Sequence, residues 1–287
     1  MRRLLIIAAL WFAAFPAYAQ FNPMVQGPAA ASSYTGIGDL ATWSVAYGTR
    51  AYSAATAGNN AIDVVCASVT YTIKTLANGD LDNATLSSDC GANTPTVRRF
   101  YCQVPACTND FLQATVAQQA TLVTSAFNGK TCAKFTATTN YTSTATINLA
   151  QPFTHSFVYE VTARPSISEN LLGDNNGAAG ADTYLTTSAG IIALYAGVSP
   201  AGVSAADNAL HEFQAVYNNT SSTTKIDSAA PASYSSPGTQ AFGGGTTMIS
   251  GLSASGGTVY MCEFSVAPSG LSSTVQGNVQ ANQSAYW

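Results

Sequence analysis

Four carboxylates are the strongest candidates in this sequence for acid–base chemistry. Glu160 and Glu212 lie on the polar side of predicted strands, where a side chain can face a groove. Glu263 lies likewise on the last predicted strand, and Asp63 interrupts an apolar run. Glycosidases use two carboxyl groups, about 5 Å apart in retaining enzymes and farther apart in inverting ones. Glu160 and Glu212 are therefore the candidate catalytic residues; the alternative is that all four are solvent-facing or paired structural carboxylates.

The other reactive side chains give weaker patterns. Asp174, in a Gly-Asp-Asn-Asn run, is either a turn residue or a calcium ligand together with the neighbouring Asn oxygens. Regularly spaced oxygen ligands are missing, so we expect no cofactor, with calcium as the alternative. His155 and His211 are isolated, and the G-x-S-x-G turn of many serine hydrolases is absent. We expect His211, at the start of a strand, to be a hydrogen-bonded structural residue.

Six cysteines are present: Cys66, Cys90, Cys102, Cys107, Cys132 and Cys262. In an exported chain they are most simply read as three disulfides, and fifteen pairings are open. The chain has only two histidines and no C-x-x-C pair, which argues against a zinc site.

Alternating strands must position these residues. Phe157, Tyr159 and Val161 alternate with polar neighbours in SFVYEVTAR, and HEFQAVYNN and GGTVYMCEFSVAP alternate in the same way. The last of these places Tyr260, Cys262, Phe264 and Val266 on one side. Gly/Ser/Asn turns separate the strands, and long helices do not intervene, which favours a sandwich or jelly roll.

The first half of the chain mixes helix and strand patterns. Ala and aromatic residues at helical spacing predict a short helix over 41–56, interrupted by Gly48. Strands are predicted at 61–66, 71–76 and 96–102. Asp82 is the predicted N-cap of a short helix that ends at Cys90.

The N-terminus carries an export signal. Arg2 and Arg3 precede an apolar run from Leu4 to Phe15, and Ala17-Tyr18-Ala19 is a small-x-small cleavage site. We therefore expect a signal peptide at 1–19 and a secreted, periplasmic or cell-surface protein without a transmembrane segment. Charged residues make up only 8% of the chain and the net charge is −4, which disfavours nucleic acid as a partner.

Three segments resemble a known group of proteins. HEFQAVYNNTSSTTKIDS and the closing GGTVYMCEFSVAPSG resemble strands of laminin-G-like, concanavalin A-type jelly rolls. The earlier AYGTRAYSAA and FYCQVPACTNDFLQATVAQQATLV resemble a module of the α-L-arabinofuranosidase B catalytic domain. The resemblance implies a mainly β jelly-roll sandwich with a small α+β N-terminal segment packed on it.

The sequence departs from the enzyme pattern where carboxylates matter. Cys102 stands where the module has Asp in Y-D-Q-S-G. Two further motifs of the enzyme family are missing: an adjacent Cys-Cys segment followed by an acidic, Gly-rich stretch, and a G-G-D-N turn late in the chain. The nearest fragment to that turn, at Asp174, lies much earlier. No catalytic residue is carried over from the family.

The resemblance also bears on the disulfides. In such jelly rolls the first and last strands of the domain are neighbours, which implies a Cys132–Cys262 bond within the about 7 Å allowed between Cα atoms. One observation conflicts with this bond. Cys262 shares its side of the strand with the apolar Phe264, whereas Cys132 shares its side with the charged Lys134. Cys66 then pairs with Cys90, and Cys102 with Cys107 in a small loop.

These patterns predict two regions after the signal peptide: an N-terminal lead-in with an arabinofuranosidase-B-like module at 20–128, and a concanavalin A-like jelly roll at 129–287. The expected function is carbohydrate recognition or surface interaction without catalysis, with a glycan or polysaccharide as partner. An arabinofuranosidase-like glycoside hydrolase and a purely structural surface module are the alternatives.

Overall fold

The computed structural model describes residues 34–136, 138–174, 180–198, 202–243, 247–250 and 257–287. The chain divides into two units, residues 1–31 and 32–287, and every described residue belongs to the second. The predicted signal peptide lies outside the described residues. Among those residues we find no helical segment with the length and apolar character that a bilayer crossing needs.

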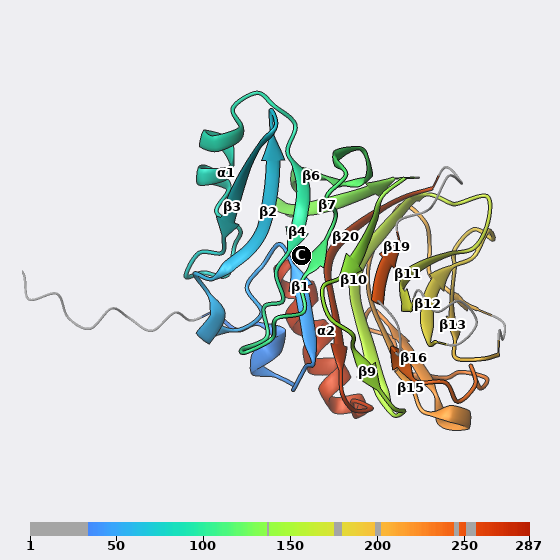
Figure 1. Ribbon diagram of the computed structural model, residues 1–287. Coiled ribbons are helices and arrows are strands. Elements are labelled where there is room, and N and C mark those ends of the chain that lie inside the picture. Colours follow the sequence, from blue (N-terminus) through green and yellow to red (C-terminus); the bar gives the residue numbers. More distant parts are fainter. Residues whose placement is uncertain (1–33, 137, 175–179, 199–201, 244–246, 251–256) are drawn as a thin grey trace, which may run out of the picture. The chain divides into compact units, whose positions relative to one another are not determined.

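Two antiparallel layers form the described unit (Figure 1). In one layer the strand order is β3-β2-β4-β6-β7-β20-β10-β15-β16-β17, and β1 pairs with the end of β20. In the other it is β5-β8-β19-β11-β12-β13-β14, and β5 joins the layers by pairing with β4. The mainly β, jelly-roll-like sandwich expected from the sequence is confirmed. The predicted division at residue 128 stays a prediction.

The bounds of the elements are as follows. The strands are β1 Val45–Gly48, β2 Asn60–Cys66, β3 Val69–Lys74, β4 Thr96–Phe100, β5 Phe111–Leu112, β6 Ala120–Phe127, β7 Lys130–Thr136, β8 Asn140–Ser143, β9 Asn148–Leu149, β10 Phe153–Ala163, β11 Glu169–Asp174, β12 Asp182–Leu185, β13 Ile191–Tyr195, β14 Val203–Ser204, β15 Leu210–Tyr217, β16 Thr223–Ile226, β17 Ala232–Ser233, β18 Phe242–Gly243, β19 Thr247–Ser250 and β20 Thr258–Ala267. The α-helices are α1 Asn83–Cys90 and α2 Ser273–Tyr286, and the 3-10 turns are Ile37–Asp39, Ala54–Thr56, Val116–Gln118 and Asn219–Ser221.

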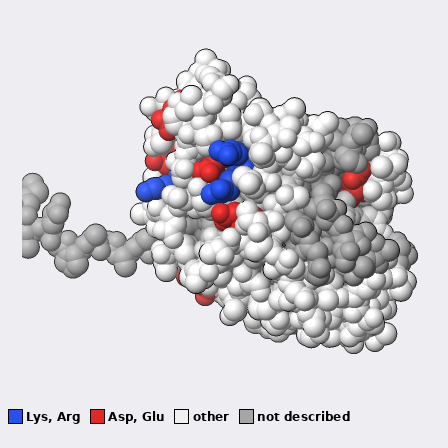
Figure 2. All heavy atoms as spheres, viewed as in Figure 1, with Lys and Arg blue, Asp and Glu red and all other residues white. Residues whose placement is uncertain are grey.

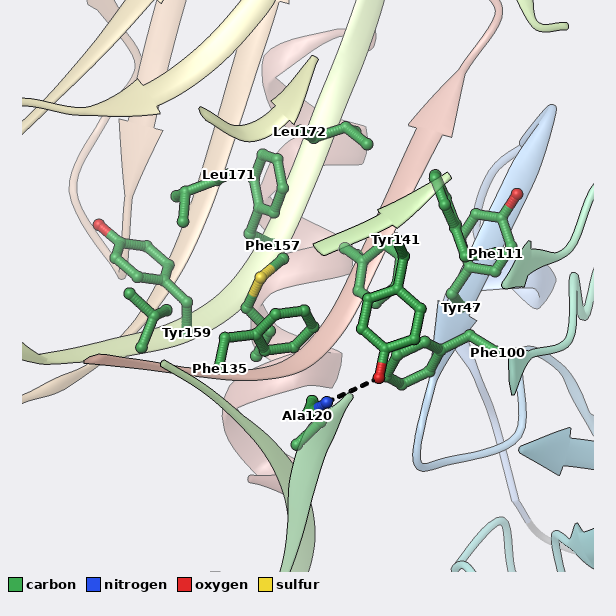
Figure 3. Packing of buried hydrophobic residues seen from close by; sticks show 14 of the residues in the cluster. Tyr47, Phe100, Phe111, Ala120, Phe135, Tyr141, Phe157, Tyr159, Leu171 and Leu172 are labelled. Atoms are coloured by element: carbon green, nitrogen blue, oxygen red, sulfur yellow. Dashed lines mark hydrogen bonds between the residues drawn. The ribbon is translucent and has the colours of Figure 1, made fainter. Parts of the chain in front are cut away.

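Aromatic side chains fill the space between the two layers (Figure 3). The rings of Phe100 and Tyr141 meet edge to face with centroids 5.2 Å apart. The Tyr141 hydroxyl accepts a hydrogen bond from the Ala120 amide at 2.8 Å and donates one to the Val97 carbonyl. A buried tyrosine can therefore add its ring to the core without leaving its hydroxyl unpaired.

The predicted alternation is confirmed in β10 and β15. Phe157, Tyr159 and Val161 face the core, as do Phe213 and Tyr217 on the neighbouring strand. Buried aromatic and β-branched side chains on one face of each strand are what fixes the register of the sheet.

In β20 the predicted alternation is wrong around Cys262. The pairing with β10 shifts register there, because Val158 lies opposite Glu263 while Tyr159 lies opposite Met261. This β-bulge turns Cys262 to the outer face, so Met261 and Phe264 both point into the core. The bulge also removes the conflict of phase with Cys132, which lies on the same outer face.

The predicted helix over 41–56 is wrong. Val45–Gly48 is strand β1, antiparallel to the end of β20. Tyr47 stacks on Phe264 in the core, with centroids 5.0 Å apart, and Ala46 packs on the other side in a cluster with Val279 of α2. Because both faces of this strand are covered, its residues show no apolar–polar alternation, and their mixture of Ala and aromatic residues imitates a helix.

The short helix predicted to end at Cys90 is confirmed as α1. The Asp82 carboxylate accepts a hydrogen bond from the Thr85 amide at 3.0 Å, as an N-cap residue does. Three disulfides are present, Cys66–Cys90, Cys102–Cys107 and Cys132–Cys262, with Cα separations of 5.1, 5.8 and 4.5 Å. These are the pairs expected above, and three disulfides are typical of a protein that folds in an oxidising environment.

Helix α2 covers the outer face of β10, β15 and β20, and its inward side is polar. Gln276, Gln280 and Gln283 are buried there. The Gln280 amide donates to the Glu212 carbonyl at 2.8 Å, and the Gln283 amide donates to the Glu263 carboxylate at 2.8 Å. A largely polar helix face thus packs on a polar sheet face, and hydrogen bonds add to the apolar contacts of Val279 in holding it in place.

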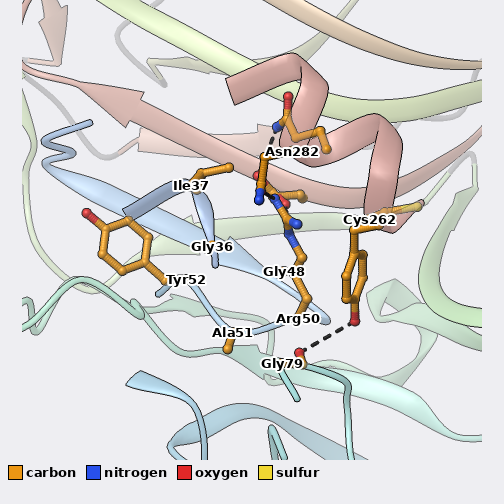
Figure 4. A network of polar contacts seen from close by, with 12 residues as sticks. Gly36, Ile37, Gly48, Arg50, Ala51, Tyr52, Gly79, Cys262 and Asn282 are labelled. Carbon is orange, nitrogen blue, oxygen red and sulfur yellow. Dashed lines mark hydrogen bonds and ion pairs between the residues drawn. The ribbon is translucent and has the colours of Figure 1, made fainter. Parts of the chain in front are cut away.

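A buried ion pair lies at the centre of this interface (Figure 4). The Arg50 guanidinium donates to the Glu263 carboxylate, and the side chains are 2% and 4% exposed. Arg50 also donates to the Asn282 amide oxygen of α2 at 2.9 Å, and its guanidinium lies 4.9 Å from the centroid of the Tyr286 ring. Arg50 therefore links the N-terminal part of the unit, the last strand and α2.

We predict that Arg50→Met destabilises the protein by roughly 3–5 kcal/mol, since it leaves the Glu263 carboxylate buried and unpaired. Urea unfolding under non-reducing conditions measures this change. The matched control is Arg98→Met, at an exposed position of β4, where the loss should be below about 0.5 kcal/mol. Equal losses at the two positions would show that the buried pair is not important for stability.

Candidate functional site

Two of the four candidate carboxylates are structural. Glu263 is held by Arg50 and Gln283, as described above. Asp63 accepts hydrogen bonds from the Thr72 hydroxyl at 2.7 Å and the Tyr101 hydroxyl at 3.0 Å, and it lies 3.8 Å from Arg99. Both carboxylates are therefore engaged by neighbouring side chains, as structural carboxylates are.

Charged side chains are sparse on the face seen in Figure 2, and one group of both signs lies over β2 and β4 of Figure 1. Ion pairs in this part of the fold join Arg99 to Asp63 and, at 3.9 Å, to Asp110. Asp110 also accepts a hydrogen bond from the Cys102 amide at 2.9 Å, and burial raises the pKa of its carboxyl. These contacts hold the loop closed by the Cys102–Cys107 disulfide.

Glu160 and Glu212 lie on the same outer face of the sheet. In the β10–β15 register Glu160 is opposite Leu210, and Glu212 is opposite Val158, so the two glutamates are diagonal neighbours. Diagonal neighbours have Cα atoms about 7–8 Å apart. Glu160 is partly exposed, and burial raises the pKa of its carboxyl, an effect that His211 opposes.

Glu212 belongs to a linked set of ionisable groups. Its carboxyl lies within hydrogen-bonding reach of the Asp227 carboxylate, in the turn after β16. Asp227 also accepts from the Glu212 amide at 3.0 Å and from His211 Nδ1 at 2.8 Å. His211 Nε2 lies 2.8 Å from the Ala206 carbonyl, so an acceptor faces each ring nitrogen, as the structural interpretation of this histidine requires.

The pKa values follow from this arrangement. Burial, together with the neighbouring Asp227 charge, raises the pKa of Glu212 to about 7. The hydrogen bond to Asp227 raises the pKa of His211. Burial raises the pKa of Asp227, but hydrogen bonds from His211 and the Glu212 amide outweigh it, and the net shift is downward. Between the pKa values of the two groups, Glu212 keeps its proton while Asp227 is ionised.

A cavity of about 380 Å³ opens beside this carboxyl pair. Strands β15 and β16 and the turn after β16 form one wall, and α2 forms the other. Lys225 is in the wall, but its ammonium already donates to the carbonyls of Asp227, at 3.0 Å, and Ala229, at 2.6 Å. The lining residues are Glu212, Lys225, Asp227, Ser228, Gly277, Gln280, Ala281 and Ser284. Two other cavities of the described unit, of about 410 and 340 Å³, have no ionisable side chain in their walls.

His155 lies away from this cavity, inside the sandwich. It is fully buried, and its Nδ1 is 2.9 Å from the Thr183 hydroxyl, which in turn contacts the Tyr217 hydroxyl at 2.9 Å. Burial lowers its pKa to about 3, so the ring is neutral. Asp174 ends β11; its side chain and residues 175–179 lie outside the described residues, so the calcium interpretation stays a prediction.

The sequence identified Glu212 but missed its partners. Asp227, Lys225 and Gln280 come from a turn, another strand and α2. The Lys-Ile-Asp-Ser turn after a short strand was the available signal for Asp227. For Gln280 no signal existed, because an inward-facing glutamine on a helix has the same pattern as a solvent-facing one.

The comparisons with known proteins give a fold and no family. No protein-family model and no curated protein matches the sequence. Among solved structures, a GH54 α-L-arabinofuranosidase soaked with a cyclic sulfate inhibitor is similar, with a TM-score of 0.67 and 17% identity. A mutant of a GH54 α-L-arabinofuranosidase soaked with 4-nitrophenyl α-L-arabinofuranoside gives 0.68 and 16%, and an arabinofuranosidase complexed with arabinofuranosyl-α-1,2-xylobiose gives 0.66 and 15%.

Each match covers 86% of this chain and 64% of the arabinofuranosidase chain. This chain therefore spans less than two thirds of the length of those proteins. At this level of identity the similarity establishes the β-sandwich fold, and the activity of those enzymes does not follow from it.

We predict that the free energy of unfolding of Glu212→Gln increases relative to that of wild type as the pH rises from about 4.5 to 7. In this range the folded state keeps a proton on Glu212 that the unfolded chain has lost, so wild-type stability falls with pH, whereas Gln cannot ionise. Urea midpoints at pH 4.5, 6 and 8 measure the difference. A pH-independent difference for Glu212→Gln would contradict the shift.

We predict the opposite pH trend for His155. Between about pH 6.5 and 3, His155 binds a proton in the unfolded chain but stays neutral in the folded protein. The free energy of unfolding of wild type therefore falls by roughly 1.4 kcal/mol per pH unit through this residue. His155→Phe should therefore lose less stability on acidification than wild type does. Parallel stability curves for the two proteins between pH 6 and 4 would refute this expectation.

Proposed function

We propose that this protein recognises glycans after export and does not hydrolyse them. The observation that carries the proposal is the pairing of Glu212 with Asp227, whose carboxyl groups interact directly in the wall of one cavity. A glycosidase needs its carboxyl groups about 5 Å apart or more, with the glycosidic bond between them. Two carboxyls in direct contact leave no such space.

The polar lining of the cavity and the fold of the protein also support glycan recognition. The cavity beside the pair offers hydroxyl, amide and carboxyl groups, which suit the hydroxyls of a sugar. The similar structures are of arabinofuranosidases, so the sandwich itself is compatible with a carbohydrate ligand. The enzyme-type motifs, an adjacent Cys-Cys segment and a late G-G-D-N turn, are missing from the sequence.

A specific observation favours one alternative, a glycoside hydrolase. A hydrolase needs two carboxyl groups, and Glu160 and Glu212 are diagonal neighbours on one sheet face. Glu160, however, is not part of the cavity wall. The residues opposite the two glutamates are apolar: Leu210 faces Glu160 and Val158 faces Glu212. Both apolar side chains pack in a cluster with Trp287.

A glycan array combined with hydrolysis of 4-nitrophenyl α-L-arabinofuranoside tests the proposal. We expect the full chain to bind members of the array and to release no nitrophenol above the level of the substrate incubated without protein. Hydrolysis that Glu160→Gln or Glu212→Gln abolishes would establish the hydrolase instead. An array without any bound glycan would leave the structural surface module as the function.

A further inference from the structure

Helix α2 is attached to the sheet through an interface in which many hydrogen bonds are incomplete. Gln276, Gln280 and Gln283 of α2 and Gln214 of β15 are at most 3% exposed, and the amide nitrogen of each donates a hydrogen bond. Their four amide oxygens have no hydrogen-bond partner among the described residues. A polar atom that loses its bonds to water on docking and gains none in exchange opposes docking.

Apolar burial offsets little of this cost. Of the buried residues of α2, only Val279 is apolar, and it packs in a cluster with Trp43. Trp287, directly after the helix, packs beside the Cys132–Cys262 disulfide. The other attachments are hydrogen bonds, with those to the Arg50–Glu263 pair as counterweight. Elements with few buried apolar contacts are the ones that open locally while the rest of a protein stays folded.

The connectivity of the fold allows α2 to leave the sheet without breaking the sandwich. The helix follows β20 through residues 268–272 and pairs with no strand (Figure 1). All three disulfides join residues that precede it, between Cys66 and Cys262, so the strands stay cross-linked when the helix is detached. Water would then reach the glutamine amides and the ion pair and supply the hydrogen bonds that docking removes.

Glu212 is the carboxyl group of β15 that faces α2, and the charges around it come from the sheet alone. The helix contains no Asp, Glu, Lys or Arg. Farther along the same face, on β20, the charge of Glu263 is balanced by Arg50. The ionisable groups nearest to Glu212 are Asp227 after β16, Lys225 on β16, Glu160 on β10 and His211 beside it on β15.

We propose that α2 is a reversible cover, which detaches from the sheet while the sandwich stays folded and which docks more tightly in mild acid than at neutral pH. Docking buries Glu212, and burial, together with the Asp227 charge, raises its pKa to about 7. In the detached state water reaches the carboxyl, so its pKa lies closer to the ordinary value of 4.5. Detachment therefore releases a proton between these values. It becomes more favourable as the pH rises through this range and does not change further above it.

The neighbouring charges do not cancel this dependence, because their own partners are not on the helix. His211 and Asp227 bind each other at 2.8 Å, and the Lys225 ammonium donates to carbonyls of the turn after β16. These contacts persist when α2 leaves. Burial raises the pKa of Glu160, which acts in the same direction as the shift of Glu212. The proposed cover goes beyond glycan recognition and does not depend on it.

Amide hydrogen exchange of the full chain, with rates corrected for the intrinsic effect of pH, tests the detachment. In wild type we expect weaker protection in α2 than in β10. Val161→Ala removes two methyl groups from the core of β10 and weakens the sandwich itself. Protection in β10 should fall roughly tenfold, and protection in α2 should stay within about twofold of wild type. Equal losses in both elements would show that α2 opens only when the whole unit unfolds, and would overturn the proposal.

Glu212→Gln tests the pH dependence with little change in shape. In wild type we expect protection in α2 to fall between pH 4.5 and 7, by at most about tenfold per pH unit, and to level off above pH 7. The variant should lose this trend, because its side chain does not ionise. Glu160→Gln, outside the cavity wall, is the matched control and should keep most of it. Protection of α2 that is constant with pH in wild type, or a trend that persists in Glu212→Gln, would overturn the pH dependence. A glycan array without bound glycan would leave the cover unaffected.

Discussion

Arg50 and Glu263 form an ion pair beneath α2, and much of the outer architecture depends on it. Two charges taken out of water are costly, so they persist only when surrounding groups complete their hydrogen bonds. Asn282 and Gln283 of α2 each add a hydrogen bond, to Arg50 and Glu263 respectively. The helix must therefore stay docked for the pair to be tolerated, and the pair in turn helps to hold the helix. This mutual requirement explains how a helix with few inward apolar side chains covers a sheet.

The docked helix also decides what the candidate site is. Glu212 was expected on a solvent-facing side of its strand, and its side of the sheet is instead covered by α2. Burial under the helix raises the pKa of its carboxyl, and the turn after β16 brings Asp227 into contact with it. Without α2 the same glutamate would be an exposed surface carboxylate. The local sequence around Glu212 therefore does not determine its chemistry; a segment about 70 residues later in the chain, near Gln280, does.

The sequence predicted those parts of the fold in which one face is buried and the other is not. In β10, Phe157 and Tyr159 mark the core side clearly. The prediction failed where tertiary context removed the alternation. Residues 45–48 are covered on both sides and imitate a helix, and the bulge at Cys262 reverses the facing of half of β20. Such a bulge depends on how two strands pair, so the sequence of β20 alone does not reveal it.

Helix α2 was missed for a related reason. A helix is recognised from an apolar stripe, and here the stripe facing the sheet consists largely of glutamines. The same glutamines that make the helix hard to recognise in the sequence supply the amide groups that bind it to β15 and β20. Replacement of this stripe by leucines would give a helix that is easy to predict, but it would remove the hydrogen bonds to the Glu212 carbonyl and the Glu263 carboxylate. The polarity that lowers the predictability of this segment is thus the same property that lets it pack on a polar sheet face.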